Sequence, residues 1–266
     1  MSLSCILLND ITVPCGYFEG HAFTSEHYMI GSIDNDDLDS LLEAGYRHFG
    51  CYFFRPVCTR CHRCVPIRVP LPGYKFPRSA RRLFNRNSRF RTEVTEPRPS
   101  REAFELYRLH KKRFGEISME HYDQFVESFF YHFSSSYQLS VFDGDKLICV
   151  SHFDMTDFAL SAIYCYFDDT YAKNSLGSFA IYKEIELGLQ NNLQYLYLGY
   201  FIRENRHMSY KANYRPNQVC IREGKWADYR DKDNNLVYDG PEEPLFYPQT
   251  RLIDPRVKGG MIGESF

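Results

Sequence analysis

Residues 137–167, YQLSVFDGDKLICVSHFDMTDFALSAIYCYF, contain three segments rich in β-branched and aromatic residues, separated by two turn signals. The segments are residues 137–142, 146–155 and 158–167. Asp143-Gly144 is typical of a tight hairpin turn, and Thr156-Asp157 marks a second, shorter turn. This stretch therefore predicts three consecutive antiparallel strands.

Helical patterns lie on both sides of these strands. Upstream, residues 101–114 and 119–133 carry apolar residues at helical spacing, and Ser100 is a suitable N-cap for the first helix. Downstream, residues 178–189 form an amphipathic pattern after Gly177, and residues 194–201 (QYLYLGYF) predict a buried strand. A helix pair, antiparallel strands, a helix introduced by glycine and a further strand are the order expected of an α+β acyltransferase core. The predicted fold class is therefore α+β.

The first 98 residues differ from the rest, because they are irregular and rich in Cys, Pro and Arg. They predict a short helix over residues 36–45, and the alternation of residues 65–71 between prolines permits an edge strand. The PRPS stretch from Pro97 marks a boundary. We therefore expect two domains, residues 1–98 and 99–266, with the tail after Asp239 extended over the surface.

The composition is that of an ordinary globular protein, with 44% hydrophobic and 25% charged residues. No stretch approaches the roughly 18 apolar residues of a transmembrane helix, and the start of the chain lacks a secretory signal pattern. The nine cysteines, an odd number, suit a reducing compartment better than a disulfide framework. We expect a cytoplasmic protein without membrane contact, and a monomer.

Basic residues are concentrated in one window of a chain whose net charge is −2. From Ala44 to Thr92 there is no Asp or Glu, but there are twelve basic residues, eleven of them Arg. Arginine grips phosphate with a planar fork of donors. The window is either a solvated basic face or, as its lack of acids favours, a surface that contacts a polyanion.

A group of soft metal ligands lies in the same window. Cys58, Cys61 and Cys64 follow one another at intervals of three, and thiolates so spaced in a turn can converge on a tetrahedral zinc ion. Cys15 or Cys51 would supply a fourth ligand. A second CxxC or an HxxxH at the spacing of a zinc ribbon or zinc finger is absent from the sequence, so the alternative that the thiols only shape a turn stays open.

Several segments resemble one known family. GYRHFGCYFFRPVCTRCHRCVPIRV and PRSARRLFNRN resemble the N-terminal domain of the arginyl-tRNA–protein transferase family (R-transferase), and especially its bacterial branch of aspartate/glutamate leucyltransferases. LSAIYCYFDD, SLGSFAIYKEIE, YLYLGYFI and MSYKANYRPNQ resemble its C-terminal blocks in the same order. The resemblance covers residues 13–229, most of the chain.

The resemblance implies an aminoacyltransferase that moves leucine from Leu-tRNA to the α-amine of proteins with N-terminal Asp or Glu, creating an N-degron for proteolysis. It also implies a Cys/Arg-rich N-terminal domain with a tRNA-binding block and a GNAT-like (acyl-CoA N-acyltransferase-like) catalytic domain. Alternatives are arginine as the donor residue, a broader, basic acceptor range, a metal-dependent nucleic-acid-binding module, and an acetyl-CoA-dependent acetyltransferase.

The resemblance also bears on whether this protein binds a cofactor. Eukaryotic members carry Cys-Gly-Tyr-Cys near their start, where this chain has Cys15-Gly16-Tyr17-Phe18, so one ligand is missing. A zinc ion or iron–sulfur cluster at Cys15, Cys58, Cys61 and Cys64 is therefore an open alternative. The chemistry itself requires no cofactor, because the aminoacyl ester is already activated.

The expected reaction needs a neutral amine, a stabilised oxyanion and a proton for the leaving oxygen. Polar groups on apolar strands are the candidates for catalysis: Asp154, Tyr164 and Tyr200. Cations for the acidic first residue of the acceptor are Arg47, His48, Arg55, Lys211 and Arg215. For tRNA phosphates the candidates are Arg78, Arg81, Arg82, Arg86 and Arg89. The alternatives are a turn-capping role for Asp154, core packing for the tyrosines and a surface position for Lys211.

Overall fold

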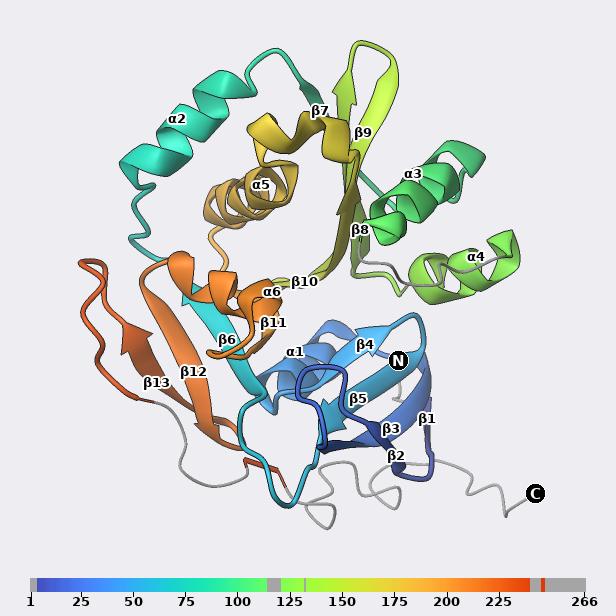
Figure 1. Cartoon of the computed structure of the whole chain (residues 1–266), viewed down its shortest axis with the longest axis vertical. Helices are drawn as coiled ribbons and strands as arrows, with labels where there is room; N and C mark the ends of the chain where they lie inside the picture. The colour runs from blue at the N-terminus through green and yellow to red at the C-terminus, as the bar shows by residue number, and fades with distance from the viewer. Residues whose placement is uncertain (1–3, 114–120, 132, 240–244, 247–266) are drawn as a thin grey trace. The chain divides into compact units, whose positions relative to one another are not determined.

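The computed structural model describes residues 4–113, 121–131, 133–239 and 245–246, and it mixes helices with sheets. The chain divides into two compact units (Figure 1). Unit 1 combines residues Met1–Pro70 with Tyr197–Phe266, and unit 2 is the continuous segment Leu71–Leu196. These boundaries differ from the expected domains 1–98 and 99–266, which stay a prediction about how the chain is organised.

The first part of unit 1 is a five-stranded antiparallel sheet with one helix. In the sheet, β3 pairs with β1, β2 and β5, and β5 also pairs with β4. The bounds are β1 Ser4–Leu7, β2 Ile11–Pro14, β3 Ala22–Ser32, α1 Asn35–Glu43, β4 Arg47–Phe49 and β5 Tyr52–Pro56.

Helix α1 forms where the sequence predicts it. The Asp34 carboxylate accepts a hydrogen bond from the Asp37 backbone N–H at 3.0 Å, which caps the helix. Its buried residues are Leu38, Leu41 and Leu42, the apolar stripe of the sequence. The helix is followed by Gly45, whose φ of 88° only glycine adopts readily.

The second part of unit 1 contains strands in the order β13, β12, β6, β11. Residues 65–71 form a strand, but not the edge strand that their prolines permit, because β6 lies between β12 and β11. Its Ile67 and Arg68 pair with β12, while its prolines stand near the two ends of the strand. The bounds are β6 Val65–Pro70, β11 Tyr195–Phe201, α6 Arg206–Ser209, η2 Tyr210–Asn213, β12 Asn217–Arg222 and β13 Lys225–Arg230.

Unit 2 contains the three strands that residues 137–167 predict, joined by the two expected turns. Strands β7, β8, β9 and β10 form antiparallel pairs in that order. The bounds are α2 Arg78–Arg86, β7 Arg91–Thr95, α3 Arg101–Lys112, α4 Tyr122–Phe130, β8 Ser136–Asp143, β9 Lys146–Met155, β10 Ala159–Phe167, η1 Asp169–Asn174 and α5 Leu176–Gln190. Helix α3 begins after Ser100, whose hydroxyl accepts from the Ala103 N–H at 3.0 Å.

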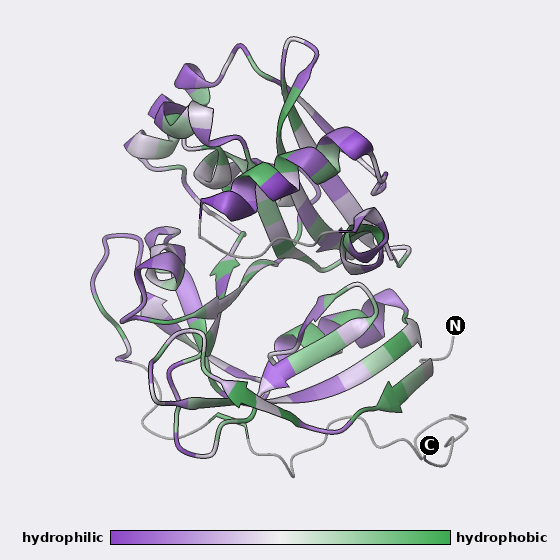
Figure 2. Ribbon diagram, turned by 45° about the vertical axis from the view of Figure 1, so that its right-hand side comes forward, coloured by the Kyte–Doolittle hydropathy of each residue, from purple (hydrophilic) through white to green (hydrophobic). Residues whose placement is uncertain are grey.

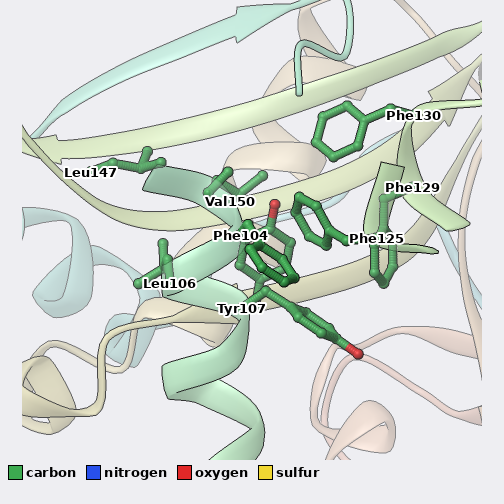
Figure 3. Packing of buried hydrophobic residues seen from close by; sticks show 10 residues of the cluster. Phe104, Leu106, Tyr107, Phe125, Phe129, Phe130, Leu147 and Val150 are labelled. Atoms are coloured by element: carbon green, nitrogen blue, oxygen red, sulfur yellow. The ribbon is translucent and has the colours of Figure 1, made fainter. Parts of the chain in front are cut away.

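An aromatic cluster holds α3 and α4 against the sheet of unit 2. Phe104 and Tyr107 of α3 meet Phe125 and Phe129 of α4, with ring centroids 5.3–5.5 Å apart (Figure 3). The helices carry both hydrophilic and hydrophobic residues along their length, as amphipathic helices do (Figure 2). Phe114 and Met119, at the ends of the two expected helices, lie outside the described residues.

Among the residues that the structure describes, no helix is long and apolar enough to cross a membrane. The tail after Asp239, expected to extend over the surface, lies outside the described residues except for Leu245 and Phe246. Phe246 is buried against Val57 and Cys220 in unit 1.

Candidate active site

Two predicted cations of unit 1 meet above the backbone of β11. A Cβ atom placed on Gly199 would lie 3.4 Å from Nε of Arg47 and 3.5 Å from Nζ of Lys211. Arg47 comes from β4 and is buried, and Lys211 comes from η2 and is half-buried. Gly199 has a φ of 80°, which favours glycine and brings the backbone close to both cations.

Lys211 is held in place by β11. Its Nζ donates a hydrogen bond to the backbone carbonyl of Tyr200 at 2.8 Å. Burial lowers the pKa of Lys211 to about 7, and the neighbouring Arg47 guanidinium lowers it further, while Cys64 acts in the opposite direction. Lys211 is thus half-buried and hydrogen-bonded to the backbone, and its role in binding the acceptor stays a prediction.

The hydroxyl of Tyr200, a candidate for catalysis, makes its hydrogen bonds to the backbone of unit 1. It donates to the backbone carbonyls of Gly45, at 2.8 Å, and Phe54, at 3.3 Å. Burial raises the pKa of Tyr200 well above its usual value. The phenol thus connects β11 to β5 and to the turn after α1, and the backbone carbonyl of the same residue positions Lys211.

Two further candidates for the acceptor site are engaged in the interior of unit 1. The fully buried Arg55 forms ion pairs with Glu26, at 3.2 Å, and with Glu223, at 3.1 Å. His48 stacks on Phe53, with ring centroids 4.5 Å apart, and its Nδ1 lies 2.9 Å from the Gly50 carbonyl oxygen. Arg215 lies half-buried in the segment between η2 and β12. The structure therefore brings together Arg47 and Lys211, and it places Arg55 in a buried ion pair.

The remaining two catalytic candidates are in unit 2. Asp154 of β9 is buried and accepts a hydrogen bond from the Ser136 hydroxyl at 3.1 Å. It lies inside the strand, with Ser136 and Ser161 as its cross-strand partners. Tyr164 of β10 packs against Phe129 and Tyr107 in the aromatic cluster.

Two of the four candidate metal-binding thiols, Cys58 and Cys64, have a raised pKa. Burial and the neighbouring thiols raise the pKa of Cys64 to about 12 and also raise that of Cys58. The Cys58 thiol bonds with the backbone of Thr24, accepting from its N–H at 3.3 Å and donating to its carbonyl at 3.6 Å. Within the described residues, no three or more His, Cys, Asp or Glu side chains converge as metal ligands would.

The candidate tRNA-binding arginines gather on one side of a single helix in unit 2. Helix α2 turns Ala80 and Leu83 inward and leaves its arginines exposed. Two arginines also contact other parts of unit 2: Arg86 donates to the Lys173 carbonyl at 2.5 Å, and Arg89, beyond the helix, pairs with Asp143 at 2.9 Å. The exposed candidates are Arg78, Arg81, Arg82, Arg86 and Arg89.

The sequence interpretation missed the glycine that the two cations approach. Gly199 interrupts the otherwise apolar and aromatic strand YLYLGYF. A glycine inside a buried strand is a known signal of close approach to the backbone, so the position could have been recognised. The acids that pair with Arg55 carried no comparable signal, because Glu26 and Glu223 lie far from it in the sequence.

Two protein-family models match successive parts of this chain. The family model described as "Arginine-tRNA-protein transferase, N terminus" matches residues 13–82, and the one described as "Arginine-tRNA-protein transferase, C terminus" matches residues 102–221. A protein of Campylobacter jejuni named aspartate/glutamate leucyltransferase is 33% identical over 77% of this chain and 88% of its own length. A protein of the same name from Hahella chejuensis is 34% identical over 79% of this chain and 92% of its own length.

Solved structures show weaker likeness. FemX aligns with a TM-score of 0.43 at 8% identity, over 77% of this chain and 82% of that one. L-PGS from Bacillus licheniformis aligns with a TM-score of 0.41 at 15% identity, over 66% of this chain and 55% of that one.

The family matches define the chain as an enzyme of the aminoacyltransferase class. It belongs to the arginine-tRNA–protein transferase family, with both family regions present in order.

Proposed function

We propose that this protein transfers leucine from Leu-tRNA to the α-amine of proteins that begin with Asp or Glu, and that the product is an N-degron. The observation that carries the proposal is the meeting of Arg47 and Lys211 over Gly199 in a chain of this family. The names of the curated relatives point to the same donor and acceptors.

The cation pair suits an acceptor with a carboxylate side chain. A guanidinium binds a carboxylate with two parallel hydrogen bonds, and an ammonium adds a compact point charge. Both cations lie against the backbone of Gly199, where a side chain would occupy the space between them. A basic acceptor residue would meet like charges there, so this arrangement favours Asp and Glu over Arg and Lys.

The contacts described above support a role for each of the other candidate residues. Arg47 and Lys211 bind the acceptor carboxylate, and Arg215 contributes to this binding from the periphery of the site. Tyr200 positions Lys211 through its carbonyl. The exposed arginines of α2 and Arg89 bind tRNA phosphates. Asp154 and Tyr164 remain candidates for catalysis.

We further propose a GNAT-like catalytic core, supported by the run of α3, α4, three antiparallel strands, α5 and β11. The protein would act as a cytoplasmic monomer without membrane contact, and its chemistry would need no cofactor. An aminoacyl ester is already activated, so positioning and proton transfer supply what the reaction lacks.

The test supplies purified protein with labelled Leu-tRNA or Arg-tRNA and with peptides that begin with Asp, Glu, Arg, Lys or Ala. We expect label to move from Leu-tRNA to the Asp and Glu peptides only. Arg47→Ala should raise the KM for the Asp peptide more than tenfold, while Lys225→Ala, an exposed cation of unit 1, should not. If label moves from Arg-tRNA, or to the Arg and Lys peptides, the proposed specificity is wrong. The alternative of an arginine donor or of a basic acceptor range then replaces it.

A further inference from the structure

The sheet of strands β1 to β5 in unit 1 has two unlike faces (Figure 1). Side chains alternate along a strand, so residues that pair across neighbouring strands lie on the same face. One face belongs to the core, where Tyr28, Ile30 and Phe53 are at most 1% exposed. The other face carries Ile6, which is 53% exposed, and Tyr52, which is 52% exposed. This second face is therefore apolar and open to solvent.

The pairing register gathers exposed apolar side chains of this face into one row. Met29 of β3 pairs with Ile6 of β1 on one side and with Tyr52 of β5 on the other. Tyr52 pairs in turn with Phe49 of β4, which is 37% exposed. The row crosses four strands and is about 14 Å long, because neighbouring strands lie about 4.8 Å apart. A contiguous exposed apolar surface of this kind marks an interaction site.

The apolar row, consisting of Ile6, Met29, Tyr52 and Phe49, lies next to the cation proposed for the acceptor's carboxylate. Arg47 precedes Phe49 by two residues on β4, so both side chains leave the same face, about 7 Å apart. The cross-strand partner of Arg47 is Phe54. Its ring stacks on Phe49 with centroids 5.9 Å apart and lies 6.3 Å from the ring of Tyr200. Aromatic rings thus connect the cation site to the apolar row without a break.

The chemistry of the row indicates which substrate covers it. None of its four side chains is charged, so it offers nothing to the phosphates of a tRNA. A cation at the side of an apolar row complements a polypeptide whose first residue is acidic and whose next residues are apolar. An extended chain advances about 3.3 Å per residue, so the row has room for about four residues.

Resting on the proposed function, we propose that this apolar row binds the acceptor polypeptide directly after its first residue and favours acceptors whose second to fourth residues are apolar. The acidic first residue, held at Arg47, decides whether a protein is an acceptor at all. The residues that follow it decide, through the row, how well that acceptor binds.

The test compares two labelled peptides that are identical from the fifth residue onward. One begins Asp-Leu-Phe-Leu and the other begins Asp-Ser-Gly-Ser. With saturating Leu-tRNA, the wild-type KM should be about tenfold lower for the apolar peptide, the effect of removing roughly 60 Å² of apolar surface from water. The kcat values should be similar, because the row contacts the chain beyond the reacting amine.

The decisive variant combines Ile6→Ser with Tyr52→Ser, which removes the two most exposed side chains of the row. It should raise the KM for the apolar peptide to that for the polar peptide and leave the KM for the polar peptide unchanged. The matched control is Leu236→Ser, which alters a 47% exposed leucine of unit 1 outside this sheet and should keep the wild-type values. Since all three side chains are exposed, the melting temperatures should stay near that of the wild type.

Equal wild-type KM values for the two peptides would overturn the inference while leaving the proposed function intact. If the double variant does not fold, this wild-type comparison decides alone. Sedimentation tests the other occupant, a second copy of the chain. A wild-type dimer that the double variant converts to monomers, with no change in either KM, would assign the row to that contact and overturn the inference. If the wild type transfers leucine to neither peptide, the proposed function fails and the inference falls with it.

Discussion

The guanidinium of Arg55 and the carboxylate of Glu26 form an ion pair in which neither side chain is exposed, with Arg55 Nε 3.2 Å from Glu26 Oε1. The Tyr46 hydroxyl also donates to this carboxylate oxygen, and Arg55 pairs on its other side with Glu223. The pair joins β3 to β5 in the interior of unit 1. Removing one charge leaves the other buried without its main partner, which is costly.

Glu26→Gln should therefore lower the free energy of unfolding by about 3 kcal/mol. The matched control is Glu105→Gln, which removes the acid of the more exposed Arg108–Glu105 pair, and it should cost below about 1 kcal/mol. Urea denaturation of the three proteins measures the difference. Equal costs for the two substitutions would contradict a structural role of the buried pair.

The exposed arginines of α2 give a prediction about tRNA affinity. Arg81→Ala combined with Arg82→Ala should weaken binding of any tRNA and reduce the slope of log affinity against log salt by about 2. The substituted side chains are exposed, so the melting temperature should stay near that of the wild type. Filter binding at several salt concentrations measures both affinity and slope.

The control for this pair is Arg98→Ala with Lys225→Ala, two exposed cations outside α2. It should leave the slope within experimental error of the wild type. If the control reduces the slope as much as the α2 variant does, the binding surface is not centred on this helix.

Gly199 and Gly224 offer a matched comparison at the acceptor site. Both have positive φ, 80° and 66°, so an alanine at either position should cost about 1 kcal/mol of stability. Only at Gly199 would the added methyl group lie between Arg47 and Lys211, since nothing lies within 4 Å of a Cβ at Gly224. Gly199→Ala should raise the KM for the Asp peptide several-fold, and Gly224→Ala should not. Equal KM values for the two variants would show that Gly199 has no role in acceptor binding.

His152 makes the stability of unit 2 depend on pH. Burial lowers its pKa to about 3, below the roughly 6.5 of an unfolded histidine. The unfolded chain therefore binds more protons between these values, so the contribution is complete above about pH 6.5 and is lost as the pH falls. His152→Phe, which keeps a ring against Phe129, should remove about 2 kcal/mol of the stability difference between pH 7 and pH 5.

Chemical denaturation at the two pH values measures this difference in the wild type and the variant. The pKa of His110 is also lowered by burial, to about 4, and its contribution is the same in both proteins. His62→Phe, at an exposed position, should leave the difference unchanged. An unchanged difference in His152→Phe would show that this histidine is not the group responsible.

Local signals in the sequence were sufficient for most elements. Ser100 and Asp143-Gly144 mark a helix start and a hairpin because capping and turn formation depend on neighbouring residues alone. The sequence permits an edge position for strand β6 because its prolines constrain only its own backbone. Its central position depends on pairing with β12, which lies some 150 residues further along the chain.

The basic window, residues 44–92, shows that predictions of function from local sequence are limited in the same way. Arg81 and Arg82 are exposed as predicted for a phosphate-binding face, but Arg55 and Arg68 of the same window are buried. Their counter-charges, Glu26, Glu43 and Glu223, come from outside the window. An acid-free stretch therefore indicates how charge is distributed along the chain, not how it is neutralised in the fold.

The division of unit 1 between the two ends of the chain has a consequence for synthesis. Residues Leu71–Leu196 emerge from the ribosome as one uninterrupted unit, whereas residues Met1–Pro70 must wait for their partners from Tyr197 onward. Arg47 is made early and Lys211 late, so the pair exists only after residue 211 has been added to the chain. A prematurely terminated product therefore lacks the paired cations, and unfinished molecules are kept from marking other proteins for destruction.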